Sequence, residues 1–208
     1  RFSFIGLGYF FRFDKRDIAA YPLDGFMVEA GLERQGLNFA GDDDMDVTTL
    51  QGKLRYYRPL GHRWYSAYSI DGKWSEGSTL SYFDQQGLGY SNTLIRGYED
   101  YIIDGYKYLI LKSNIKYNIL PERRTELGFI NNEKFSLIHY ALYLNFFADA
   151  GIMIDRHFTD ENLLANKMLG GTGFGLDLHT YYDLVIRSEI TLNRHGKSGV
   201  FFHLLAPI

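Results

Sequence analysis

Apolar and polar residues alternate with a period of two along much of this chain. In the stretch 48–56, Leu50 and Leu54 occupy even positions, whereas Lys53 and Arg55 occupy odd ones. The same alternation recurs in three further stretches, 106–119, 136–147 and 184–193. Because successive side chains of a strand point to opposite faces, this period predicts strands that each have one polar and one apolar face.

The alternation predicts an all-β chain of about nine strands over the 208 residues. The composition agrees, because 17 Tyr, 16 Phe and 22 Gly against only 4 Pro favour strands and allow them to curve. We expect these strands near residues 3–13, 26–37, 47–57, 64–74, 106–119, 136–149, 170–179, 184–193 and 199–206.

The predicted connections differ in length between the two ends of the strands. Three are short and carry turn residues, at Pro22–Gly25, Arg58–Gly61 and Thr180–Asp183. Three are longer and polar, at 38–46, 75–105 and 150–169. Tight turns at one end and long loops at the other are typical of an outer-membrane β-barrel. The segment 120–135 departs from this rule, because its place predicts a short turn yet it has sixteen residues.

A soluble β-sandwich would show the same alternation, so other features must separate the two architectures. The polar faces carry long charged side chains in mid-strand, such as Lys112, Lys116 and Arg187, which a water-filled lumen tolerates. The apolar faces carry aromatic residues near strand ends, such as Tyr9 and Trp64, as in the aromatic girdles of membrane barrels. These features favour an antiparallel transmembrane β-barrel.

The number of strands implies that the barrel is incomplete. With nine antiparallel strands, the first and the last run in the same direction and cannot close an antiparallel barrel on each other. We therefore expect residues 1–208 to be the C-terminal part of one barrel domain, with the N-terminal strands and any periplasmic module absent from this chain.

Composition argues against several classes of function. The 22 basic and 25 acidic residues give a net charge of −3, so nucleic acid is not an expected partner. The chain has no cysteine, its six histidines form no i, i+4 pair, and it contains no Gly-x-Ser-x-Gly motif. We therefore expect no metal, no cofactor and no enzymatic activity in this chain.

Two short motifs point to a contact between a loop and a strand. One is Arg96-Gly97-Tyr98, within the longest polar segment. The other consists of Phe147, Asp149 and Gly151, at the end of one predicted strand and on the side of its polar face. If the loop folds into the lumen, its arginine can form a bidentate, charge-assisted pair with the aspartate. The glycine beside that arginine would allow a close approach of the backbone.

These motifs resemble those of the BamA and TamA family of outer-membrane assembly barrels, also called bacterial surface antigens. In that family an arginine-glycine-aromatic motif at the tip of a loop enters the barrel, and a Phe-x-Asp-x-Gly motif on a later strand receives the arginine. The segment Asp14–Asp17, followed by the turn Pro22–Gly25, also matches the family pattern, and the matches keep their order over nearly all 208 residues.

The resemblance implies the C-terminal part of a sixteen-stranded barrel in the bacterial outer membrane that inserts or exports other proteins. It implies that Arg96, Gly97 and Tyr98 lock the loop, and that the second motif receives it. The implied partners are outer-membrane lipid, unfolded outer-membrane protein substrates and periplasmic assembly partners.

Two other functions stay open at this point. Some members of the family carry a patatin-like lipid hydrolase before the barrel, and this chain would then be the membrane anchor of that enzyme. A third alternative is a family barrel without an N-terminal module and of unknown role. The residues that precede Arg1 in the protein would distinguish the three alternatives.

Overall fold

The computed structural model describes residues 5–36, 46–77, 80, 82–90, 93–126, 137–156, 162–180 and 184–204. Nine strands form within these residues. Their bounds are β1 (Gly6–Asp14), β2 (Gly25–Gln35), β3 (Val47–Gly61), β4 (Trp64–Gly77), β5 (Lys107–Glu126), β6 (Leu137–Ile154), β7 (Met168–Thr180), β8 (Leu184–Asn193) and β9 (Ser198–His203).

The nine strands form one sheet in the order in which they follow along the chain, and each is antiparallel to its neighbours. The described residues contain no helix. Accordingly, a helix with the length and apolar composition to cross a membrane is absent from the described part of the chain. The predicted all-β class and antiparallel arrangement are confirmed.

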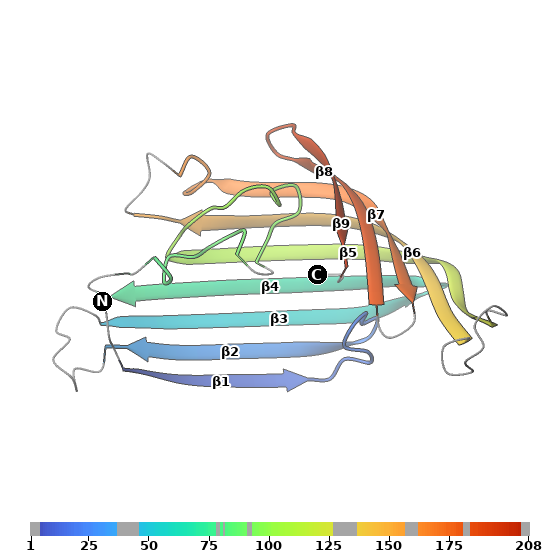
Figure 1. Ribbon diagram of the computed structural model, residues 1–208, viewed down its shortest axis with the longest axis horizontal. Coiled ribbons are helices and arrows are strands. Elements are labelled where there is room, and N and C mark those ends of the chain that lie inside the picture. Colours follow the sequence, from blue (N-terminus) through green and yellow to red (C-terminus); the bar gives the residue numbers. More distant parts are fainter. Residues whose placement is uncertain are drawn as a thin grey trace.

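The sheet is strongly curved and has a concave face. From β1 to β6 it forms a trough, and β7, β8 and β9 turn over toward the side on which the β4–β5 connection lies (Figure 1). We call the described residues 82–90 and 93–106 of that connection the inner loop. Because the strands alternate in direction, the β2–β3, β4–β5, β6–β7 and β8–β9 connections lie at one end of the sheet. The other four lie at the opposite end.

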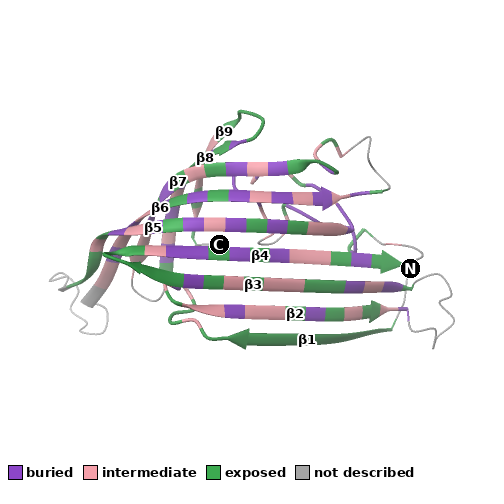
Figure 2. Ribbon diagram, turned by 180° about the vertical axis from the view of Figure 1, so that it is seen from behind, coloured by how far each residue is buried: buried purple, intermediate pink, exposed green. Residues whose placement is uncertain are grey.

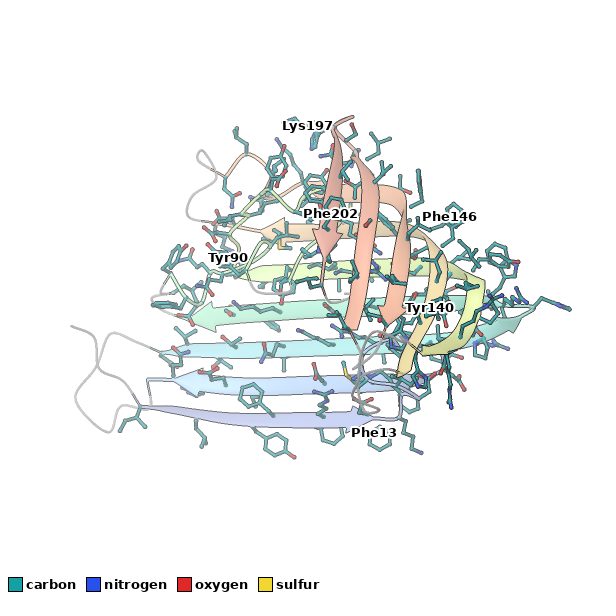
Figure 3. The ribbon with its side chains drawn as sticks, turned by 45° about the vertical axis from the view of Figure 1, so that its right-hand side comes forward. Phe13, Tyr90, Tyr140, Phe146, Lys197 and Phe202 are labelled. Atoms are coloured by element: carbon teal, nitrogen blue, oxygen red, sulfur yellow. The ribbon has the colours of Figure 1, made fainter. Side chains whose placement is uncertain are left out.

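The two faces of the sheet show the reverse of the burial expected for a protein in water. The convex face is apolar and exposed, so that Leu50 is 50% exposed and Leu111 is 45% exposed. The concave face is polar, and most of its side chains on β4 to β8 are buried, so that Asn145 is 0% exposed. Buried and exposed bands alternate along the strands in Figure 2, and Figure 3 shows Phe13 and Phe146 on the outer side. This sheet therefore has a polar interior and an apolar exterior.

Apolar side chains cover the two ends of this polar interior. At one end, residues of the inner loop pack against β5, β6 and β7, in a cluster that includes Leu88, Ile95, Tyr98, Ile103, Ile110, Met153 and Leu169. At the other end, Tyr21 of the β1–β2 connection packs with Tyr143 and Val185. Along β6, the buried Asp149 lies between Tyr143 of one cluster and Met153 of the other.

One predicted turn is wrong. The turn residues at Arg58–Gly61 lie within β3, which ends at Gly61, and the chain reverses at His62 and Arg63. Both turn residues have positive φ angles, 46° and 69°. Two consecutive residues with positive φ angles form a hairpin turn whose twist matches that of the two strands it connects. Pro59 fits in the strand because the register shifts between Pro59 and Gly61.

The long connection predicted at 120–135 is shorter than expected. β5 continues to Glu126 through two register irregularities, and β6 begins at Leu137, which leaves 127–136 outside the described residues. Bulges of this kind let a strand continue although its simple alternation is interrupted. The last strand ends at His203 rather than at 206, and residues 205–208 lie outside the described residues.

The described sheet is open, with β1 and β9 as its two edges. All nine residues of β1 are exposed, so that both of its faces are uncovered. The antiparallel order also means that β1 and β9 run in the same direction. A direct pairing of these two edges would therefore be parallel.

Candidate functional site

The inner loop carries Arg96 to the concave face at a tight turn. The backbone N–H of Tyr98 donates to the carbonyl of Ile95 at 3.0 Å. Gly97 has a φ angle of 92°, a conformation that favours glycine. Its carbonyl accepts a hydrogen bond from the side chain of Asn193 on β8 at 2.9 Å. The turn is thus attached to β8 at the residue that follows Arg96.

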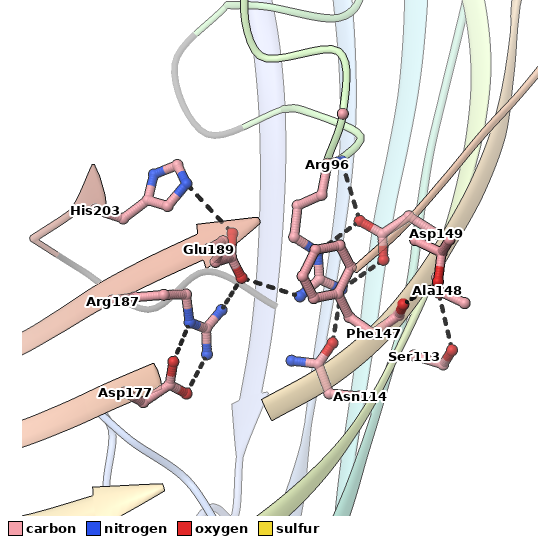
Figure 4. Close-up of polar contacts among 12 residues, drawn as sticks. Arg96, Ser113, Asn114, Phe147, Ala148, Asp149, Asp177, Arg187, Glu189 and His203 are labelled. Carbon is pink, nitrogen blue, oxygen red and sulfur yellow. Dashed lines mark hydrogen bonds and ion pairs between the residues drawn. The ribbon is translucent and has the colours of Figure 1, made fainter. Parts of the chain in front are cut away.

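Arg96 and Asp149 form a bidentate ion pair inside the sheet (Figure 4). Nε of Arg96 donates to Oδ2 of Asp149 at 2.8 Å, and Nη2 donates to Oδ1 at 2.5 Å. The backbone N–H of Arg96 also donates to Oδ2, at 3.1 Å. The two side chains are 1% and 0% exposed. A charge this deeply buried is tolerated only when it is paired and hydrogen-bonded, so each residue depends on the other.

Three further residues shape the space around Arg96. Asn114 on β5 accepts a hydrogen bond from Nη2 at 2.6 Å. The guanidinium carbon lies 3.9 Å from the centroid of the Phe147 ring, a cation–π arrangement. Gly171 on β7 leaves room for the loop, because a Cβ atom there would overlap the carbonyl oxygen of Arg96. Residues of β5, β6 and β7 therefore surround Arg96 of the inner loop.

The polar network continues from Arg96 across the interior. Glu189 on β8 lies 3.6 Å from Nη1 of Arg96 and 3.6 Å from Nη1 of Arg187. Arg187 donates to Asp177 at 2.6 and 2.7 Å, and the hydroxyl of Tyr21 donates to the same carboxylate at 2.7 Å. Burial raises the pKa of Tyr21, so its hydroxyl stays protonated and can donate. Charged and hydrogen-bonded groups thus connect the inner loop to the β1–β2 connection.

The structure brings together most of the site residues predicted from the sequence. Arg96, Asp149 and Phe147 are in direct contact, as described above. Gly151 lies on the same buried face of β6, and a Cβ atom there would meet the side chain of Ile95 in the inner loop. Tyr98 is different, because it points into the apolar cluster rather than toward the ion pair.

Several residues of the network were not predicted as site residues. They are Tyr21, Asn114, Asp177, Arg187 and Glu189. Arg187 and Glu189 could have been found from the sequence, because each is a charged residue in mid-strand on the polar face. This pattern does not show which charges meet, because the pairs join different strands and a loop.

The arrangement supports a structural role for Arg96, because its hydrogen bonds go to Asp149 and Asn114. A second cluster of polar side chains lies next to Arg96. Glu99 of the inner loop, Glu189 of β8 and His203 of β9 are the residues whose ligand atoms gather closely enough to hold a metal ion in the described part of the chain.

No protein-family model matches the chain, and no curated protein matches it either. The resemblance to the BamA and TamA family therefore rests on the sequence motifs.

Proposed function

We propose that the convex face of this sheet contacts lipid and that the strands belong to a transmembrane β-barrel of the bacterial outer membrane. The inverted burial supports this proposal. In water an apolar surface of this extent would promote association, whereas hydrocarbon would stabilise it. Neighbouring strands are joined by antiparallel backbone ladders, with register shifts only in the β3–β4 and β5–β6 pairs, and such pairing satisfies backbone groups in hydrocarbon.

The barrel of this proposal is completed by strands that precede β1. The uncovered faces of β1 support this, because in a closed barrel the polar face of every strand lines the lumen. The shared direction of β1 and β9 also requires an antiparallel barrel to contain further strands. In this proposal residues 1–208 form the C-terminal part of a sixteen-stranded domain of the BamA and TamA family.

The proposed function of that domain is to insert or export other proteins at the outer membrane. The single observation that carries it is the buried pair of Arg96 and Asp149, which joins an arginine-glycine-aromatic loop to a Phe-x-Asp-x-Gly strand. In this function the pinned loop braces the lumen. Unfolded substrate strands would pair with an exposed edge of the sheet through backbone hydrogen bonds.

The test uses the full protein, reconstituted in phospholipid vesicles and supplied with an unfolded outer-membrane protein. The measurement is the rate at which that substrate becomes protease-resistant. We expect a faster rate than with vesicles that contain a porin of similar size, and a slower rate for Arg96→Ala than for Arg12→Ala. Arg12 is a suitable control because it lies on β1 with an exposed side chain. Equal rates for this protein and the porin would contradict the proposal.

The same vesicles distinguish the two alternatives. Release of fatty acid from the vesicle phospholipid without substrate insertion would favour the membrane anchor of a patatin-like lipid hydrolase. The absence of both activities would favour a barrel without an N-terminal module and with another role.

A further inference from the structure

Three ionisable or metal-ligating side chains from three different elements converge beside Arg96. They are Glu99 of the inner loop, Glu189 of β8 and His203 of β9, and their ligand atoms lie within 4.8 Å of one another. Nε2 of His203 lies 3.4 Å from Oε2 of Glu189, and Figure 4 shows these two side chains facing each other. Their distance along the chain explains why the sequence alone predicts no metal site.

Glu189 is buried without hydrogen bonds to compensate its charge. Its side chain is 0% exposed, and among the described residues neither carboxylate oxygen has a hydrogen-bond donor. Arg96 and Arg187 each form a bidentate pair with an aspartate and reach only Oε1 of Glu189, at 3.6 Å. Oε2 is directed toward His203 instead. Because both arginines are also paired with aspartates, a further cation beside Oε2 would help to compensate the charge of Glu189.

Glu99 presents a second carboxylate to the same space. Its Oε2 accepts a hydrogen bond from the backbone N–H of Gly97 at 2.7 Å. Its Oε1 is buried and has no hydrogen-bond partner among the described residues. Two carboxylates that share one space need a proton or a cation between them.

We propose that Glu99, Glu189 and His203 bind one divalent transition-metal ion, with Zn²⁺ as the representative ion. An imidazole nitrogen and a carboxylate oxygen are both ligands that zinc uses in proteins. Ligands at about 2.0–2.1 Å from a tetrahedral zinc lie about 3.3 Å from one another. The 3.4 Å between His203 and Glu189 matches that separation, and Nε2 of His203 has no hydrogen-bond partner that would compete for its lone pair.

A metal at this place would join the inner loop to two strands that already pair through their backbones. It would connect the inner loop to β8 and to β9, which pairs with β8 only and is an edge of the described sheet. Binding would therefore stabilise the loop next to Arg96 and the edge strand at the same time. This inference does not depend on the proposed function in protein insertion.

The test is a zinc titration of the full protein in detergent, after removal of bound metal with a chelator. Isothermal titration calorimetry should give one Zn²⁺ per chain. We expect Glu99→Gln and His203→Gln each to weaken the affinity at least tenfold, since each removes one ligand while keeping a similar shape. His62→Asn is the matched control, because His62 lies in the β3–β4 turn and Asn tolerates its positive φ angle. Its affinity should equal that of the unaltered protein.

Anomalous diffraction at the zinc edge provides a second measurement that does not depend on variants. The expected result is one peak among Glu99, Glu189 and His203. The proposal is overturned if the unaltered protein binds no zinc, if Glu99→Gln and His203→Gln bind it as tightly as the control, or if the peak lies elsewhere.

Discussion

At the scale of single residues, the main feature is Arg96, a buried arginine whose charge is compensated by Asp149 and whose guanidinium also donates to Asn114. Arg96 has three hydrogen bonds to Asp149, one of them through its backbone, and a fourth to Asn114. Removing one member of a buried pair leaves the other charge uncompensated, which costs more than the pair itself contributes. This contact, together with the hydrogen bond from Asn193 to Gly97, therefore holds the turn of the inner loop against the sheet.

The first prediction concerns the coupling of Arg96 and Asp149. Arg96→Ala and Asp149→Ala should each lower the free energy of unfolding by about 3–5 kcal/mol, because each leaves a buried charge unpaired. The double variant should be little worse than either single one. A double-mutant cycle by denaturant unfolding measures this coupling. Arg12→Ala, which removes the two ion pairs of an exposed side chain, should cost less than about 1 kcal/mol. Strictly additive losses would show that the two residues do not act as a unit.

The second prediction concerns the glycines of β7. Gly171 faces the loop, and a Cβ atom there would overlap the carbonyl oxygen of Arg96, whereas the nearest atom to a Cβ at Gly170 is 3.8 Å away. Gly171→Ala should therefore displace the inner loop and increase its cleavage by added protease. Gly170→Ala, one residue earlier on the opposite face, should leave cleavage unchanged. If both variants were cleaved at the same rate, β7 would not position the loop.

At the scale of the strands, polar and apolar side chains alternate because each strand separates two environments. Transmembrane strands need about 9–11 residues, and β5 and β6 have 20 and 18. These two strands therefore extend beyond the length that hydrocarbon would cover. They also provide Asn114 and Asp149, so the same strands that form the wall hold the loop.

The third prediction compares two positions on β3. Leu54 lies on the exposed apolar face and Gln51 on the opposite face, where its side chain is not enclosed. Leu54→Arg should lower the free energy of unfolding in lipid vesicles by about 2–4 kcal/mol, because it places a charge in hydrocarbon. Gln51→Arg should have little effect. Equal losses at the two positions would indicate that both faces contact the same solvent.

The sequence predicts the strands well and their ends less well. Alternation identifies β5 and β8 because apolar and polar residues alternate along them, so that one face is apolar and the other is polar. It fails at Pro59, since a bulge keeps a turn-forming residue inside β3. For the site, the motif leads to Arg96 and Asp149. The contacts of Glu189 depend on the curvature of the sheet, which the local pattern does not contain.

At the scale of the whole molecule, the longest connection lies at one end of the sheet and the shortest lies at the other. The inner loop and the β8–β9 turn lie at one end, and the two-residue turn at His62 and Arg63 lies at the other. In an outer-membrane barrel the long connections face outside and the tight turns face the periplasm.

The fourth prediction tests this orientation in intact cells. The chain has no cysteine, so a single introduced cysteine can be labelled without background. His195→Cys, in the exposed β8–β9 turn, should react with a membrane-impermeant reagent added to intact cells. His62→Cys, in the exposed turn at the other end, should react only after the outer membrane is permeabilised. The opposite pattern would reverse the proposed orientation.

The most direct test of the lipid-facing exterior is the accessibility of spin labels along β6 in the full protein, reconstituted in lipid vesicles. Labels at Leu142, Leu144 and Phe146 should collide often with oxygen, which concentrates in hydrocarbon. Labels at the intervening Tyr143 and Asn145 should not, because these side chains are buried on the concave face. A period of two in oxygen accessibility, with its maxima at the even positions, is the predicted result. An absence of alternation, or maxima at the odd positions, would contradict the proposal that the convex face contacts lipid.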